Sequence, residues 1–157
     1  MKYNDLSKKT ALKEGLADTF SGALSFLRLG NTFISFVAPD MEHYWNPEAY
    51  FGSDVREQLT TILENAFDSD DEIMLISHSL GTMISYDNLW KFSHYSEYRS
   101  KYGNNKKVDL WVTMGSPLGD ENVKRYLKGS KSKGRLRYPH NIRKWVNISA
   151  EDDYIIS

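Results

Sequence analysis

The sequence contains no cysteine, which removes disulfide bonds, thiolate metal sites and a cysteine nucleophile from consideration. It also lacks any apolar run of about eighteen residues, so no segment is expected to span a membrane. Residues 1–12 mix charged and polar side chains and lack the unbroken apolar stretch of a secretion signal. The formal net charge of -1 selects no charged partner. These absences predict a cytoplasmic protein.

What remains is the composition of an ordinary globular domain. The chain has 157 residues, of which 40% are hydrophobic and 26% are charged. This length supports one core and is too short for two comfortable domains. Residues 1–157 are therefore expected to form a single domain, with a core over 54–157 and a helical segment over 7–29. The sequence shows no internal repeat and no nucleic-acid-binding motif.

The segment 7–29 carries one apolar stripe with the spacing of a helix. The side chains that form it are Leu12, Leu16, Phe20, Leu24 and Leu27. Such a stripe ordinarily packs on a core, and the alternatives are a membrane-surface anchor or a lid over a lipid site. Residues 32–37 are rich in Phe, Ile and Val, which predicts a short strand or a buried turn. The aromatic residues and the proline within 40–51 predict an irregular segment.

Helical and strand patterns alternate through the rest of the chain. Asp54 and Glu57 have the spacing of a capping box, and the apolar residues that follow, as far as Phe67, predict a helix. Three later apolar runs predict strands, at 73–76, 108–114 and 145–148. The first run is apolar at every position, which is typical of a strand that is buried on both faces. Because parallel neighbours need a helical crossover, this alternation predicts an α/β fold with a doubly wound, mainly parallel sheet.

The sharpest motif follows the first of these strands. Residues 76–82 read ISHSLGT, which is close to the G-x-S-x-G nucleophile elbow and lies in the strand-to-helix context that this motif requires. In such a turn the Ser79 hydroxyl projects from the sheet, and the positions two residues away must be small. Gly81 meets that demand, and Ser77 replaces the first glycine with a small side chain. Because a helix N-terminus favours an oxyanion, the Leu80 N–H is the expected donor.

With this motif the sequence resembles the α/β-hydrolase superfamily, in particular its lipase- and esterase-like members with a G-H-S-L-G elbow. The resemblance covers about half of the chain, mainly 73–155, and three segments carry it: ISHSLGT at 76–82, WVTMGSPLG at 111–119 and WVNISAEDDYI at 145–155. The resemblance implies an α/β-hydrolase-like core. It also implies a serine hydrolase that acts on carboxylic esters or lipids through an acyl-enzyme on Ser79, with no metal and no cofactor. Within it, Asp153 is the expected acid of the catalytic triad, and Asp152 is the second choice.

The histidine of that triad has no counterpart in this sequence. In the family it follows the acid on a later strand, whereas only four residues follow Asp153 here. His78 lies within the elbow, where the backbone carries it away from the nucleophile, and is interpreted as a packing or hydrogen-bonding residue. His43, His94 and His140 do not match the family position and are expected to be structural or exposed. The hydrolase core is therefore expected to be partial, with the base outside this chain.

Two other functions fit the same residues. The domain can be a noncatalytic or degenerate α/β-hydrolase-like binding module that keeps the elbow as architecture, or an enzyme that transfers the acyl group to an acceptor other than water. A partial sheet would also expose an edge strand, at which a second copy or a partner chain can pair. Residues 122–150 contain many Lys and Arg and no acidic residue, which is more typical of a solvated loop than of a phosphate or headgroup contact.

Overall fold

The computed structural model describes residues 39–46, 48–69, 71–103 and 105–148. Residues 39–45 are helical. The later elements in chain order are α3 (Phe51–Asp68), β1 (Met74–His78), α4 (Leu80–His94), α5 (Ser96–Tyr102), β2 (Val108–Met114), η1 (Pro117–Gly119), α6 (Glu121–Tyr126), η2 (Gly134–Arg137) and β3 (Ile142–Ile148). The helix predicted over 7–29 and the strand or turn predicted over 32–37 lie outside the described residues, as do Asp152 and Asp153.

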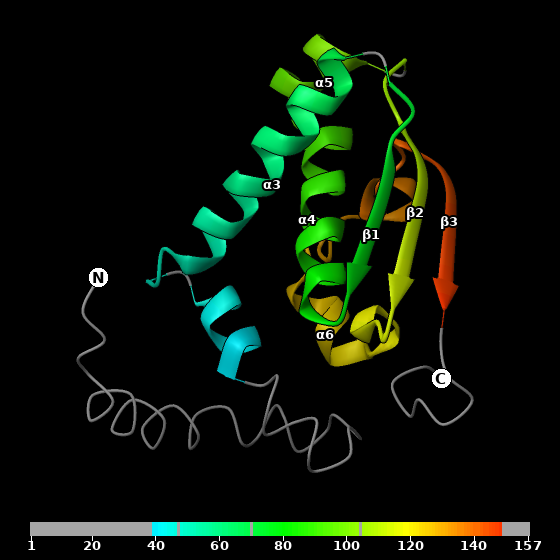
Figure 1. Cartoon of the computed structure of the whole chain (residues 1–157). Coiled ribbons are helices and arrows are strands. Elements are labelled where there is room, and N and C mark those ends of the chain that lie inside the picture. The colour runs from blue at the N-terminus through cyan, green and yellow to red at the C-terminus, as the bar shows by residue number, and fades with distance from the viewer. Residues whose placement is uncertain (1–38, 47, 70, 104, 149–157) are drawn as a thin grey trace, which may run out of the picture.

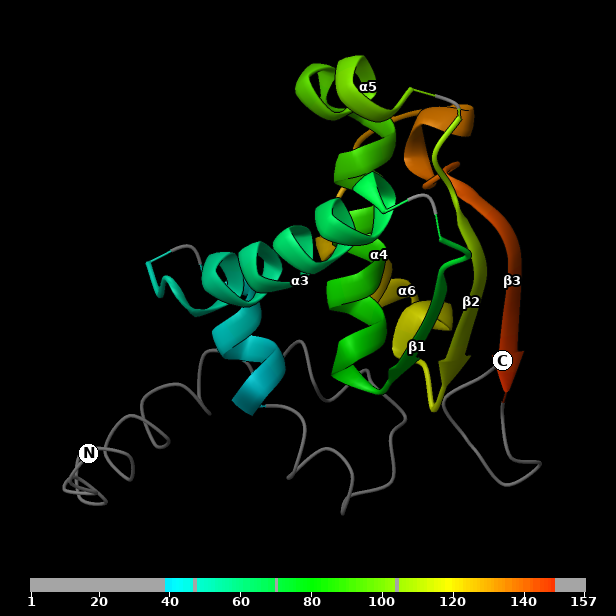
Figure 2. The ribbon, with the colours of Figure 1, turned by 45° about the horizontal axis from the view of Figure 1, so that its top comes forward.

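The three strands form a parallel sheet in the order β1-β2-β3 (Figure 1). Their register places Ile76 opposite Val112, and Val112 opposite Val146. Figures 1 and 2 show α3, α4 and α6 together on one side of this sheet. Right-handed crossovers explain the arrangement, because strands that are added in one direction place their connecting helices on the same face. The predicted α/β class with a parallel sheet is confirmed.

The core lies between the sheet and these helices. Trp111 in the central strand β2 is fully buried and stacks on Trp145 of β3, with ring centroids 4.3 Å apart. Its Nε1 donates a hydrogen bond of 2.8 Å to Ser77 Oγ on β1. Met83 and Leu89 of α4 are also fully buried. Burial of these large side chains supplies the hydrophobic free energy that holds α4 over β1 and β2.

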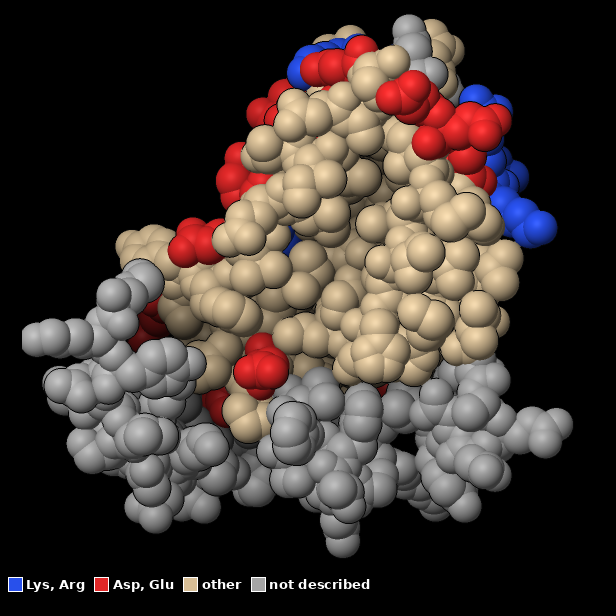
Figure 3. Space-filling model, in the orientation of Figure 1, with Lys and Arg blue, Asp and Glu red and all other residues tan. Residues whose placement is uncertain are grey.

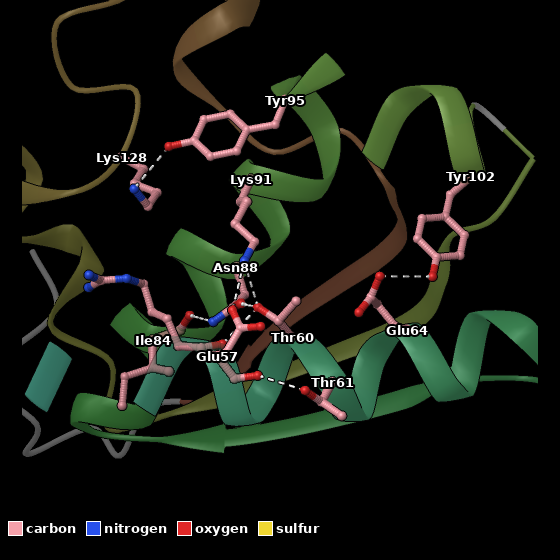
Figure 4. A network of polar contacts seen from close by, with 11 residues as sticks. Glu57, Thr60, Thr61, Glu64, Ile84, Asn88, Lys91, Tyr95, Tyr102 and Lys128 are labelled. Atoms are coloured by element: carbon pink, nitrogen blue, oxygen red, sulfur yellow. Dashed lines mark hydrogen bonds and ion pairs between the residues drawn. The ribbon is translucent and has the colours of Figure 1, made fainter. Parts of the chain in front are cut away.

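Helix α3 is fixed to α4 by a buried polar network (Figure 4). Thr60 has no exposed surface, and its Oγ1 donates to Asn88 Oδ1 at 2.7 Å. The Asn88 amide is oriented by its own bond of 3.0 Å from Nδ2 to Ile84 O. Lys91 Nζ donates to Thr60 Oγ1 at 2.8 Å. Each buried polar group in the network therefore has a partner, as burial requires.

A second buried cluster joins residues 39–45 and the segment after α6 to α4. Asp87 is only 2% exposed, and its Oδ2 accepts a hydrogen bond of 2.6 Å from the Tyr44 hydroxyl. Its Oδ1 accepts from the Lys128 N–H at 2.7 Å. Burial raises the pKa of Asp87, and the two hydrogen bonds, with the charges of Arg56 and Lys128, oppose that shift only in part.

Two predictions around α3 are wrong. The helix begins at Phe51 rather than at Asp54, because the Asp54 N–H already donates to Tyr50 O at 2.9 Å inside the first turn. The N-cap residue Tyr50 has no side-chain cap, so the capping box does not form. Residues 39–45, which fall largely within the predicted irregular segment, are helical. Tertiary contacts such as that between Tyr44 and Asp87 favour this helix over the local propensity of an aromatic sequence.

Replacement of Thr60 by valine tests the α3–α4 network. Thr60→Val keeps the shape of the side chain but leaves Asn88 Oδ1 and Lys91 Nζ without their shared hydroxyl partner. We expect the free energy of unfolding in urea to fall by about 1–3 kcal/mol, with an unchanged m value. The control is Thr61→Val at the exposed neighbouring position, for which a loss below about 0.5 kcal/mol is expected. Equal losses would contradict a buried role for Thr60.

The raised pKa of Asp87 predicts a pH-dependent contribution to stability. The protonated carboxyl is favoured in the folded state, so its stabilising contribution is complete below the unfolded pKa, near about 4, and is lost as the pH rises through the folded pKa. The free energy of unfolding of the native chain, minus that of Asp87→Asn, should therefore fall as the pH is raised from about 4. Urea titrations at several pH values measure this difference. A difference that stays flat, or matches that for the exposed Asp54→Asn, would contradict the prediction.

Candidate functional site

Ser79 alone connects β1 to α4. The strand ends at His78 and the helix begins at Leu80, so the chain reverses direction at one residue. Ser79 has φ 51° and ψ -125°, and it is the single non-glycine among the described residues with a positive φ. Such a conformation costs a residue with a side chain about 1–3 kcal/mol and persists only where the surrounding structure enforces it.

Hydrogen bonds on both sides hold this strained residue. The Ser79 N–H donates to Met114 O at the end of β2, over 3.0 Å. The Ser79 carbonyl accepts from the Thr82 N–H at 2.9 Å and from Thr82 Oγ1 at 2.7 Å. Ser116 Oγ, in the turn after β2, donates to Thr82 Oγ1 at 3.1 Å. The elbow of residues 76–82 is thereby joined to the segment 111–119.

Thr82 and Ser116 are site residues to which the sequence analysis gave no role. Both are buried, with exposed fractions of 0% and 4%. Thr82 lies in the motif ISHSLGT and Ser116 in the motif WVTMGSPLG. The signal for their role is a contact between segments 34 residues apart, which neither local sequence contains.

Ser77 and Gly81 adjoin at the elbow, as the motif requires. Ser77 is buried, and its Oγ accepts from Trp111 Nε1 and lies 3.4 Å from Val112 O. A Cβ built on Gly81 would lie 3.9 Å from the Ser77 Cβ, which is an ordinary van der Waals contact. The space at Gly81 therefore accommodates an alanine.

Leu80, the expected oxyanion donor, is the first residue of α4. A first helical residue has no acceptor for its N–H within its own helix. The hydrogen bonds of the described residues engage the N–H groups of Ser79 and Thr82 but not that of Leu80. Together with the helix dipole, this N–H can stabilise a negative charge that develops beside Ser79.

Of the four histidines in the described residues, three have partners other than Ser79 and the fourth is exposed. His94 Nε2 lies 2.9 Å from Tyr138 O, and the His140 ring lies edge-on to the His94 ring at 5.0 Å. Burial lowers the pKa of His140, and the His94 charge lowers it further. The His43 ring contacts Phe51, while His78 is exposed at the end of β1. Within the part of the chain that the structure describes, no histidine forms a hydrogen bond with Ser79.

The end of β3 lies at the same edge of the sheet as the elbow. The register places His78 opposite Met114, and Met114 opposite Ile148, so the carboxyl ends of all three strands coincide. Ligands of parallel α/β sheets bind outside this edge. Residues 149–157, with the candidate acids Asp152 and Asp153, follow directly but lie outside the described residues.

We also searched the described residues for cavities, metal-binding groups and membrane-spanning helices. Three cavities of about 400, 370 and 240 Å³ lie over the described residues, and Ser79 lines none of these three. Among the same residues, no group of three or more His, Asp or Glu side chains is placed to hold a metal ion. None of their helices combines the length and apolar character that crossing a membrane requires.

Comparisons with known proteins provide no relative from which a role could be transferred. No protein-family model matches the chain, and no match was found among curated proteins or solved structures. The likeness to α/β-hydrolases therefore depends on the sequence motifs and on the local geometry at Ser79.

Strain at Ser79 can be measured by comparing two substitutions. Ser79→Gly and Ser79→Ala both remove the hydroxyl, but only glycine adopts a positive φ without steric cost. We expect Ser79→Gly to exceed Ser79→Ala in free energy of unfolding by about 1–2 kcal/mol, as measured in urea. The same pair at Ser53, an exposed position in α3, should show the opposite order by about 0.5–1 kcal/mol. An alanine variant at position 79 as stable as the glycine variant would show that the turn is unstrained.

Proposed function

We propose that this chain carries the nucleophile of a serine hydrolase, with Ser79 forming an acyl-enzyme from a carboxylic ester or lipid. The observation that carries the proposal is the positive φ of Ser79 at the junction of β1 and α4. Nucleophile elbows use this strained turn to expose a serine hydroxyl at the carboxyl edge of a parallel sheet. Strained residues with side chains are concentrated at functional sites, which supports a chemical role for this one.

The proposed reaction uses three groups. Ser79 Oγ attacks the ester carbonyl carbon while a general base takes its proton, and the base then returns this proton to the departing alkoxide. The Leu80 N–H donates a hydrogen bond to the oxyanion of the tetrahedral intermediate. Water then attacks the acyl-enzyme with help from the same base. The base is a histidine from outside this sequence, oriented by Asp153, with Asp152 as the second choice.

The hydrogen bonds around the elbow support this assignment. Thr82 uses its N–H and its hydroxyl on the Ser79 carbonyl, and Ser116 fixes the Thr82 hydroxyl in turn. The backbone of the nucleophile is thus held in place while the Leu80 N–H has no partner among these bonds. Electrostatic stabilisation of a transition state requires such preorganised donors.

A second candidate function is a noncatalytic or degenerate binding domain that keeps the elbow as architecture. Two observations on the described residues favour it: no histidine forms a hydrogen bond with Ser79, and Ser79 lines none of the three cavities. Acyl transfer to an acceptor other than water uses the same elbow and differs from hydrolysis only in the second step.

A fluorophosphonate probe distinguishes an activated serine from an architectural one. We expect covalent labelling of the native chain in the presence of imidazole, found by intact mass and peptide mapping at Ser79, and a loss of at least tenfold in Ser79→Ala. Ser53→Ala, on α3, should label like the native chain. Reactions with and without added imidazole are compared, because a small soluble base can substitute for a histidine from outside the sequence. A folded chain that stays unlabelled under both conditions would contradict the hydrolase and favour the binding domain.

A further inference from the structure

One face of the sheet is apolar and carries no helix of the described chain. We call it the open sheet face, and its side chains are Met74, Ile76, Leu110, Val112, Met114, Val146 and Ile148, with His78 and Lys144 at its ends. Met74, Ile76 and Ile148 are 62%, 58% and 53% exposed. Figure 3 shows an area over the strands, below the charged groups of the upper edge, in which the visible side chains are uncharged.

This exposure contradicts the prediction that the run 73–76 is buried on both faces. The run is apolar at every position, yet only Ile73 and Leu75 pack against the core, while Met74 and Ile76 turn away from it. Parallel sheets occur almost only with both faces covered, and a contiguous apolar surface marks a place where something else packs. The open sheet face is therefore expected to have an occupant.

The described residues cannot supply that occupant. Helices α4 and α6 are crossovers of one hand and lie together on the opposite face. Helix α3 is held on that same face through Thr60 and Asn88, and residues 39–45 through Tyr44 and Asp87. Within this sequence only residues 1–38 and 149–157 remain. The second of these has nine residues with three consecutive acids, which is unsuited to covering an apolar face.

We propose that the apolar stripe of residues 7–29 docks on the open sheet face. From Leu12 to Leu27 a helix would extend about 23 Å, which matches the length of a seven-residue strand such as β2. The outer strands of a three-stranded sheet lie about 10 Å apart, so the face has room for one helix of about 10 Å diameter. Residues 30–38 can span about 30 Å when extended, which is longer than any strand of this sheet.

This docking assigns the stripe a role other than those of a lid or a membrane anchor. Its apolar side chains would be buried against Ile76 and Val112, on the face of the sheet opposite α4. The contact does not involve Ser79 chemistry, so it stands whether or not the chain is a hydrolase.

The absence of cysteine permits a direct test with single thiols in the full chain. Ile76→Cys places a thiol on the open sheet face, and Ile62→Cys places one on α3, at side chains that are 58% and 63% exposed. We expect a maleimide to label Ile76→Cys at least tenfold more slowly than Ile62→Cys. Adding Phe20→Asp within the stripe should accelerate labelling of Ile76→Cys at least tenfold and leave that of Ile62→Cys unchanged. Ser25→Asp, outside the stripe, should change neither rate.

Three outcomes would overturn the proposal. Equal labelling rates at the two positions would show that nothing covers the face. If labelling of Ile76→Cys is slow, varies with protein concentration and is unchanged by Phe20→Asp, the occupant is a second copy of the chain. If it is slow and changes with neither the protein concentration nor Phe20→Asp, the occupant is another part of the chain. If Phe20→Asp unfolds the protein, which loss of the cooperative urea transition reports, Leu24→Gln serves as the milder variant with the same expectations.

Discussion

The positive φ at Ser79 is the constraint on which the candidate site depends. It lets the chain pass from β1 into α4 within one residue, so the helix must pack directly over the strand that it follows. The cost of about 1–3 kcal/mol is sustained because α4 buries Met83 and Leu89 against the sheet. A turn that relaxed would move the whole helix, and with it the N–H groups at its start.

Buried polar residues along α4 fix where that helix lies. Thr82 bonds to the turn after β2, Asn88 to α3, and Asp87 both to Tyr44 and to the backbone after α6. Four segments that are distant in sequence are thus joined to one helix by groups that would be costly to bury unpaired. The position of α4 is set by several independent contacts, which is the condition under which a strained elbow at its N-terminus can persist.

The sequence predicts β1 and β2 closely because short runs of mostly apolar residues mark both strands. It misses the first three residues of β3, where Arg143 and Lys144 interrupt the apolar pattern. It predicts the body of α3 from its stripe but not its start, since no side chain caps the helix at Tyr50. It locates Ser79 because strand, turn and helix signals coincide within seven residues. It misses the roles of Thr82 and Ser116, which arise from a contact between two segments, and the exposure of Ile76, because apolar runs do not show which face of a sheet is covered.

Handedness links the elbow to the open sheet face. Each right-handed crossover that carries the chain from one strand to the next places its helix on the side of the sheet where α4 begins at Ser79. The other side can be covered only by residues that do not connect β1, β2 and β3. A stripe at 7–29 that packs there on Ile76 and Val112 has its apolar side chains engaged, and it cannot at the same time serve as a lid over a lipid at Ser79.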